Sequence, residues 1–336
     1  MSSFDVSTIS MLTVPKIAKI LRDRFQKGIV CTMCADILLY VGSIACNVSA
    51  EEDFTNFKSQ LTRTCTNKSQ TIVVTGEHCS GKSMICNRIC IDIISDVDMS
   101  MFVRNAIHLL NLFGNAKTLT NHDTSKFTSM FKIFMNQSVC VGFEVSVIHI
   151  NLTHLTEPPL TEQNFNVFSQ ESDLKYCMSS SMYKECSALL TCIRYLIDHS
   201  SNLECTKVAN MLGINQVLFD RTFNHKSIAL NNERILCPLN EDEKKRRAKR
   251  LAQLLYYSLF KTIVRKMQRT VPEMDHKFIA VLDVVGFQNI GINDFEQFMS
   301  NYTFEKFNEY YVDRKINNTT NEFMDDRFTS ATSLLY

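Results

Sequence analysis

The stretch GEHCSGKS at residues 76–83 constrains this chain more than any other part of its sequence. It matches the pattern G-x-x-x-x-G-K-[ST], it follows the apolar run TIVVT at residues 71–75, and apolar residues recur behind it at helical spacing. A strand, a tight loop and a helix in that order place backbone N–H groups and a helix N-terminus around an anion. A chance Gly-Lys-Ser at a turn is the alternative, but both flanking segments favour a phosphate-binding loop.

The chemistry of this loop predicts how it would hold a nucleotide. Lys82 would reach the outer phosphates, and the Ser83 hydroxyl would hold Mg²⁺. The other positions would present their backbone N–H groups to the phosphates: Gly76, Glu77, His78, Cys79, Ser80 and Gly81. We therefore expect a magnesium nucleotide as the ligand.

Composition excludes several other classes of function. The chain is 45% hydrophobic and 21% charged, which is typical of a soluble globular protein. Because 36 basic residues balance 35 acidic ones, no bulk charge favours nucleic acid or an anionic membrane. The sequence shows neither a secretory signal nor an apolar stretch long enough to insert into a bilayer, so we expect a cytoplasmic protein with reduced cysteines.

Periodicity predicts long elements. Helices are expected at residues 14–27, 102–112, 172–211 and 240–267, and strands at 37–41, 71–75, 139–150 (one strand or a hairpin) and 277–282. Residues 47–69 are polar and are expected to be a connection. Asn240 with Glu243, and Asp294 with Gln297, are typical of capping boxes that open helices. The basic run at 244–250 could be a nuclear signal or a phosphate-backbone patch, but the apolar stripe behind it favours a solvated helix face.

Three segments, in this order, resemble the motor head of the myosin family. Residues 76–83 resemble its P-loop, FGNAKTLTNHDTSKF at 113–127 resembles the segment running into switch I, and LDVVGFQ at 282–288 resembles switch II. EQNFNVF at 162–168 and NYTFEK at 301–306 resemble two further family motifs, the second of which lies in the relay helix. The resemblance is collinear from about residue 4 to residue 311.

The resemblance implies an α/β fold. It implies a P-loop NTPase core with a mostly parallel twisted sheet flanked by helices, plus a mainly helical upper subdomain. The core would comprise about residues 1–170 with 270–316, the upper subdomain about 171–269, and a polar tail 317–336. A family head continues past the relay helix into a converter and lever arm. We therefore expect either a truncated head without autonomous motility or a partial gene model.

The resemblance implies ATP and Mg²⁺ as cofactors, and it assigns roles in binding them to residues outside the loop. In switch I, Asn121 would touch phosphate, Thr124 would lie near the attacking water, and Ser125 would supply a second Mg²⁺ hydroxyl. In switch II, Asp283, which ends a predicted strand, would hold the outer shell of the metal, and the Gly286 N–H would meet the γ-phosphate.

One pair of catalytic positions departs from the family. Myosins join an arginine of switch I to a glutamate of switch II, and this chain has Lys126 and Gln288 there. A lysine and a neutral amide make at best one hydrogen bond, whereas arginine and carboxylate make a bidentate ionic pair. Gln288 also cannot accept a proton from water. The alternative is tolerated drift within a working ATPase.

Four further departures lie around the nucleotide. Asp123 replaces an asparagine and brings a negative charge near the phosphates, and Cys79 replaces a glycine whose missing Cβ lets the backbone adopt positive φ. Residues 42–44 and 151–154 do not match the family's adenine-framing segment and its E-K-S-R.

These changes predict a protein that binds Mg-ATP with slow or absent hydrolysis. An active actin-dependent ATPase of the cytoskeleton and a nucleotide-independent pseudo-motor acting as an interaction module stay open as alternatives. A GTPase is disfavoured because no N-K-x-D follows. Actin filaments are a partner implied by the resemblance alone, and the oligomeric state stays open.

Overall fold

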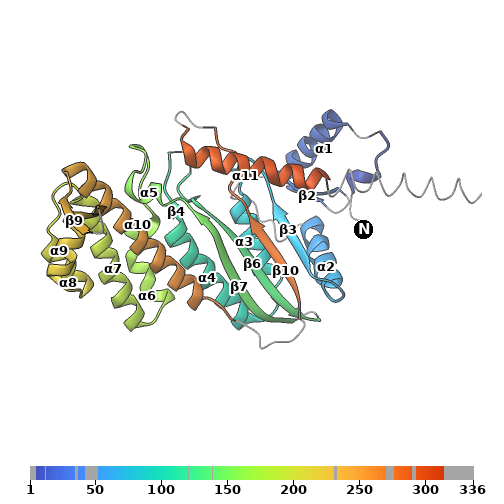
Figure 1. The fold of residues 1–336 in the computed structure, drawn as a ribbon. Helices are drawn as coiled ribbons and strands as arrows, with labels where there is room; N and C mark the ends of the chain where they lie inside the picture. Colours follow the sequence, from blue (N-terminus) through green and yellow to red (C-terminus); the bar gives the residue numbers. More distant parts are fainter. Residues whose placement is uncertain are drawn as a thin grey trace, which may run out of the picture.

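A computed structural model describes residues 5–11, 13–34, 37–41, 52–119, 121–137, 139–230, 233–269, 276–289 and 293–313 of the chain. Within these residues a small sheet is flanked by helices, and the predicted α/β class is confirmed (Figure 1). No helix of the described residues is both long and apolar enough to cross a bilayer. The predicted polar tail and the residues 42–44 lie outside the described part of the chain.

Four strands form the central sheet, in the order β3 (Gln70–Val74), β10 (Lys277–Asp283), β6 (Phe127–Asn136) and β7 (Val139–Ile150). β10 runs parallel to β3 and antiparallel to β6, and β6 and β7 are also antiparallel. The prediction of a mostly parallel sheet is therefore wrong for the described strands, which form a mixed sheet. The two residues between β6 and β7 are too few for the crossover that parallel neighbours need.

The parallel pair in this sheet brings two distant segments together. Asp283, the last residue of β10, lies in register with Val74, the last residue of β3. The loop after β3 and the chain after β10 therefore leave the same edge of the sheet, which is where ligands bind in α/β proteins.

Two helices pack behind this sheet (Figure 1). Helix α3 (Lys82–Asp92) follows the loop directly and buries Ile85, Cys86, Ile89 and Cys90, in agreement with the predicted spacing. Helix α4 (Val97–Gly114) confirms and extends the helix expected at 102–112, and Asp96 caps it by accepting from the Met99 N–H at 2.7 Å. These helices set two of the walls of the site.

The chain between residues 171 and 269 is mainly helical, as expected, and short helical turns precede it from residue 153 on. The helices from residue 153 on are α5 (Thr153–Thr156), α6 (Leu174–Cys177), α7 (Ser180–Asp198), α8 (Cys205–Leu212), α9 (Gln216–Asn224) and α10 (Glu241–Lys266). Short 3₁₀ turns lie at Asn166–Phe168 and Glu171–Asp173, and the hairpin β8 (His225–Leu230) and β9 (Glu233–Pro238) was not anticipated. Whether this part is a separate subdomain stays a prediction.

Helix α10 begins at the predicted capping box. The Asn240 side chain accepts from the Glu243 N–H at 2.8 Å, and the Glu243 carboxylate accepts from the Asn240 N–H at 3.0 Å. The basic run in its first turns has an internal role, because Arg247 donates to the carbonyls of Thr222, Phe223 and His225 at the C-terminal end of α9. These bonds satisfy carbonyls that a helix end leaves without partners.

An aromatic cluster joins α10 to the site. Tyr256, fully buried, donates its hydroxyl to the Phe113 carbonyl at 2.6 Å and stacks on Phe165 with ring centroids 5.1 Å apart. Phe113 lies in the last turn of α4, directly before the strands β4 (Asn115–Ala116) and β5 (Thr124–Ser125). The cluster therefore fixes the chain that enters switch I.

The N-terminal part and the last helix complete the structure. A 3₁₀ turn (Val6–Thr8) and α1 (Val14–Gln26) precede the hairpin of β1 (Cys31–Cys34) and β2 (Ile37–Tyr40). Helix α2 (Glu52–Cys65) occupies the segment expected to be a connection, so that prediction is wrong. Helix α11 (Phe295–Val312) opens at the second predicted capping box, on Asp294, and crosses the edge of the sheet (Figure 1).

Candidate nucleotide-binding site

The loop of residues 76–83 has the backbone of an anion cradle. Three of its residues have positive φ: Gly76 at 154°, Cys79 at 61° and Gly81 at 87°. Gly81 is the N-cap of α3, so the free N–H groups of the first helical turn open toward the loop. Cys79 pays a steric penalty that glycine would avoid, because a left-handed backbone crowds a Cβ.

The segment after β10 packs directly on this loop. The His78 N–H donates to the Phe287 carbonyl at 3.1 Å. A Cβ added to Gly286 would lie 2.7 Å from the Gly76 carbonyl oxygen and within van der Waals overlap of the Lys82 ammonium. Only glycine fits at position 286, which explains the residue that the switch II resemblance singled out.

Lys82 lies between the two segments. Its ammonium donates to the carbonyl of Glu77, five residues earlier in the loop. Burial lowers the pKa of Lys82, and the nearby carboxylate of Asp283 opposes that change. A partly desolvated ammonium at the mouth of a backbone cradle gains more from an added anion than one in open water does.

Asp283 supplies a buried carboxylate beside the first turn of α3. It is 5% exposed, and burial raises its pKa, while hydrogen bonds from Ser83 and Cys86 and the charge of Lys82 oppose the rise. The Ser83 hydroxyl and the carboxylate that it contacts are hard oxygen donors of the kind that Mg²⁺ prefers. A cation here would also compensate the buried negative charge.

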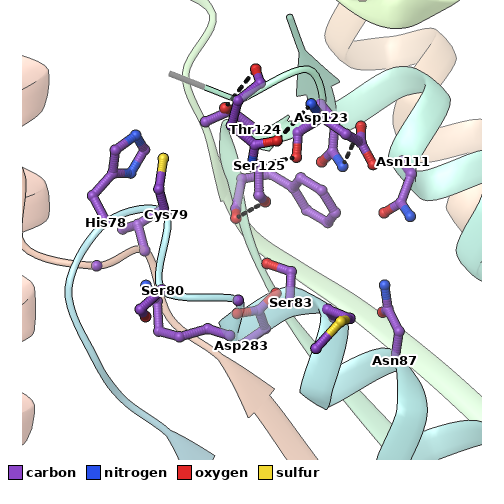
Figure 2. Close-up of a pocket in the computed structure, with 18 of the residues that line it drawn as sticks. His78, Cys79, Ser80, Ser83, Asn87, Asn111, Asp123, Thr124, Ser125 and Asp283 are labelled. Atoms are coloured by element: carbon purple, nitrogen blue, oxygen red, sulfur yellow. Dashed lines mark hydrogen bonds between the residues drawn. The ribbon is translucent and has the colours of Figure 1, made fainter. Parts of the chain in front are cut away.

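Switch I lines the opposite wall, and its side chains are held by one another (Figure 2). Thr124 is 3% exposed and its hydroxyl is 2.8 Å from that of Thr118, and the Ser125 hydroxyl donates to the Phe127 carbonyl at 3.1 Å. Asn121 accepts from the Asp123 N–H at 3.1 Å. These hydrogen bonds would have to break before the Thr124 hydroxyl could contact the attacking water and before the Ser125 hydroxyl could bind Mg²⁺.

The Asp123 carboxylate is held by hydrogen bonds from two side-chain amides. Its Oδ1 accepts from the side-chain amides of Asn115 and Asn166, each at 2.9 Å. The carboxylate still lines the cavity, as expected, but two donors stabilise it where it stands.

Lys126 and Gln288 are not partners in the described structure. The Lys126 ammonium is 2.9 Å from a carboxylate oxygen of Glu162, and the two side chains are only 13% and 15% exposed. Gln288 is bound to α11 instead: its N–H donates to Asn301 at 2.7 Å, and its side-chain carbonyl accepts from Gln297 at 3.3 Å. Glu162 is a residue whose role sequence reasoning missed, although it begins one of the motifs that carry the resemblance.

Two histidines surround the Lys126–Glu162 pair. Burial and the positive charge of Lys126 lower the pKa values of both His78 and His154. His154 is 3% exposed, with Nε2 2.9 Å from the Gln163 carbonyl and Nδ1 3.7 Å from Glu162. Both rings are therefore kept neutral beside a buried ion pair.

Most of the predicted site residues, though not all of them, line one cavity of about 340 Å³. Its walls include the following predicted site residues: His78, Cys79, Ser80, Gly81, Lys82, Ser83, Asn121, Thr124, Ser125, Asp283 and Gly286. The cavity wall does not include Gly76, Glu77, Lys126 or Gln288. The cavity also extends along α3 and α4, where sequence reasoning assigned no role.

Comparison with known proteins identifies myosins as relatives of this chain. A family model described as the myosin head (motor domain) matches residues 196–331, which include β10 and α11. Myosin-4 of Saccharomyces cerevisiae is 22% identical over 97% of this chain and 30% of its own length. The chain is therefore similar to the myosin motor domain, at low identity.

Two further relatives agree with this assignment. A probable myosin heavy chain of Encephalitozoon cuniculi is 22% identical over 91% of the chain and 23% of its own length. Unconventional myosin-Vc of Homo sapiens is 22% identical over 73% of the chain and 18% of its own length. The chain therefore spans less than a third of each of these myosins.

Proposed function

We propose that this myosin homologue binds a magnesium nucleoside triphosphate, ATP by resemblance, in the cavity between the P-loop and switch I. The observation that carries the proposal is the junction of β3, the P-loop and α3, with Lys82 at the cradle and Asp283 in register beside it. The cradle depends on backbone N–H groups, which bind phosphate whichever side chains the loop carries.

The donor set around Ser83 fits Mg²⁺. Ser83 and Ser125 would supply hydroxyl ligands, and Asp283 would hold the outer shell of the ion. When bound, the ion would neutralise charge on the phosphates. The chain itself would hold the triphosphate through the loop N–H groups and Lys82. Gly286 would leave open the space beside Lys82 that a larger side chain would fill.

We propose further that hydrolysis is slow or absent. Phosphoryl transfer depends on positioning and on charge that is in place before the reaction. Lys126 is bound to Glu162, and Gln288 is bound to α11, so no ionic pair joins the two switches across the described site. Gln288 offers no proton acceptor to the attacking water.

A titration tests binding and cleavage on the same sample. The full chain should bind ATP more tightly with Mg²⁺ than without it, and a single-turnover assay should show little phosphate release. Lys82→Ala should abolish binding, whereas Lys19→Ala, on the exposed face of α1, should leave it unchanged. Equal affinity of the Lys82→Ala variant and the wild-type chain would refute the site.

Actin binding, a cytoskeletal location and a role as an interaction module rest only on the relatives being myosins. Co-sedimentation with actin filaments, with and without nucleotide, tests this part separately. Failure to co-sediment would leave the nucleotide proposal intact.

A further inference from the structure

The cavity has a second end that the phosphate chemistry does not use. Beyond Lys82 and Ser83 it runs between α3 and α4, and its walls there are Met84, Asn87, Arg88, Ile91, Asn111 and Asn115. Three of these six side chains are neutral carboxamides. Carboxamides are poor phosphate ligands compared with lysine or arginine, so this end has a different chemistry from the cradle.

Helical geometry explains why these side chains face the same space. Met84, Asn87 and Ile91 are three and four residues apart on α3, so they share one face of that helix. Asn111 and Asn115 are four residues apart at the C-terminal end of α4. Figure 2 shows the carboxamides of Asn87 and Asn111 pointing toward each other across the cavity.

A buried acceptor marks the same wall. The side-chain carbonyl oxygen of Asn115 has no hydrogen-bond partner among the described residues, and the residue is 3% exposed. Its amide nitrogen is already committed to Asp123 at 2.9 Å. An unpaired buried carbonyl costs free energy, so a ligand that brings a donor to this wall would be favoured.

The distance from the cradle suits the far end of a nucleotide. Asn87 lies five residues after Lys82, which at 1.5 Å per residue is about 7.5 Å along the axis of α3. A base attached through ribose to the bound phosphates would reach this depth. Met84 and Ile91 would offer apolar contact to its ring, while the carboxamides would meet its polar edge.

We propose that Asn87 and Asn111 read the base of the bound nucleotide and that they select adenine. This inference rests on the proposed phosphate site. A carboxamide places an acceptor beside a donor, which complements the N6 amino group and N7 of adenine. Guanine presents two acceptors on that edge, which suit the guanidinium of an arginine rather than a carboxamide.

Calorimetric titration with three probes separates the inference from the function on which it rests. The probes are ATP, GTP and inorganic tripolyphosphate, each with Mg²⁺, on the full chain. We expect ATP to bind about tenfold more tightly than GTP, because one bidentate base contact contributes about 1–3 kcal/mol of discrimination. Tripolyphosphate should bind through the cradle alone and should lose its binding in Lys82→Ala.

Variants then locate the base contact. Asn87→Ala and Asn111→Ala should each weaken ATP about tenfold and leave tripolyphosphate unchanged. The matched control is Asn105→Ala, on an exposed position of α4 outside the cavity, which should change neither. A preference for GTP, or variants that bind ATP as the wild type does, would overturn the inference while tripolyphosphate binding upholds the cradle. Failure of tripolyphosphate to bind would overturn both.

Discussion

We predict that Glu162 limits how much ATP cleavage can be restored by substituting the residues at positions 126 and 288. Restoring the family pair requires Lys126→Arg together with Gln288→Glu, because an arginine without a carboxylate, or a carboxylate facing lysine, makes no bidentate contact. The new arginine would, however, stand beside Glu162, which already binds the residue at position 126 at 2.9 Å. Two carboxylates would then compete for one guanidinium.

The size of this competition follows from the burial of the pair. Both side chains are less than one-sixth exposed, and a charge-assisted hydrogen bond contributes about 1.5–3 kcal/mol net. That corresponds to roughly a 10- to 150-fold bias toward Glu162. We therefore expect the double variant to cleave ATP only slightly faster than the starting chain. Adding Glu162→Gln should raise the single-turnover rate at least about tenfold over the double variant, in proportion to the bias removed.

The controls make the result specific. Glu157→Gln in the double background removes another acid of the same segment, one whose partner is Lys249 at 2.8 Å, and it should not accelerate cleavage. Glu162→Gln alone should also fail, because position 288 remains neutral. If the triple variant binds ATP as the double variant does but cleaves no faster, Glu162 is not the competitor and the explanation must be abandoned.

Two further predictions concern stability. Cys79→Gly should raise the free energy of unfolding by about 0.5–1 kcal/mol, measured in urea, because it removes the Cβ that the left-handed backbone crowds, although glycine also loses more conformational entropy on folding. Alanine keeps that Cβ, so a Cys79→Ala variant that is equally stabilised would contradict this cause. Burial lowers the pKa of His154 in the folded chain below 6.5, the value of an unperturbed histidine. The free energy of unfolding therefore keeps the full contribution of the neutral ring above pH 6.5 and falls as the pH drops below that value, because the unfolded chain then binds the proton more readily. Unfolding between pH 7 and pH 5 should therefore depend less on pH in His154→Gln, which can still donate to Gln163, and equal slopes would exclude His154 as the proton-linked group.

The parts of the site that sequence predicted are those encoded locally. The P-loop, the turn of α3 behind it and the capping box at Asn240 depend on residues within a few positions of one another. Asp283 was found because a strand followed by Gly286 has a recognisable pattern. In each case the sequence holds the whole determinant in one short window.

The errors arose where the determinant is a pairing between distant segments. Strand β6 was missed, and the resemblance led us to expect a mostly parallel sheet, because strand direction depends on partners that periodicity does not identify. Helix α2 was missed because its buried residues, such as Phe54 and Leu61, are diluted by polar neighbours. Glu162 lies 36 residues from Lys126, and the resemblance directed attention to Gln288 instead.

The same distinction separates binding from coupling in this site. In the proposed site, phosphate affinity would come from backbone N–H groups, a helix terminus and one lysine, so we expect it to survive a substitution such as Cys79 that leaves the course of the loop intact. Coupling of the two switches requires two particular side chains to meet, and either one can be diverted by a third residue. Lys126 is held by Glu162 and Gln288 by α11, so each switch is stabilised without reference to the other. A site of this kind can hold a nucleotide in a fixed cradle while the closure that cleaves it is disfavoured.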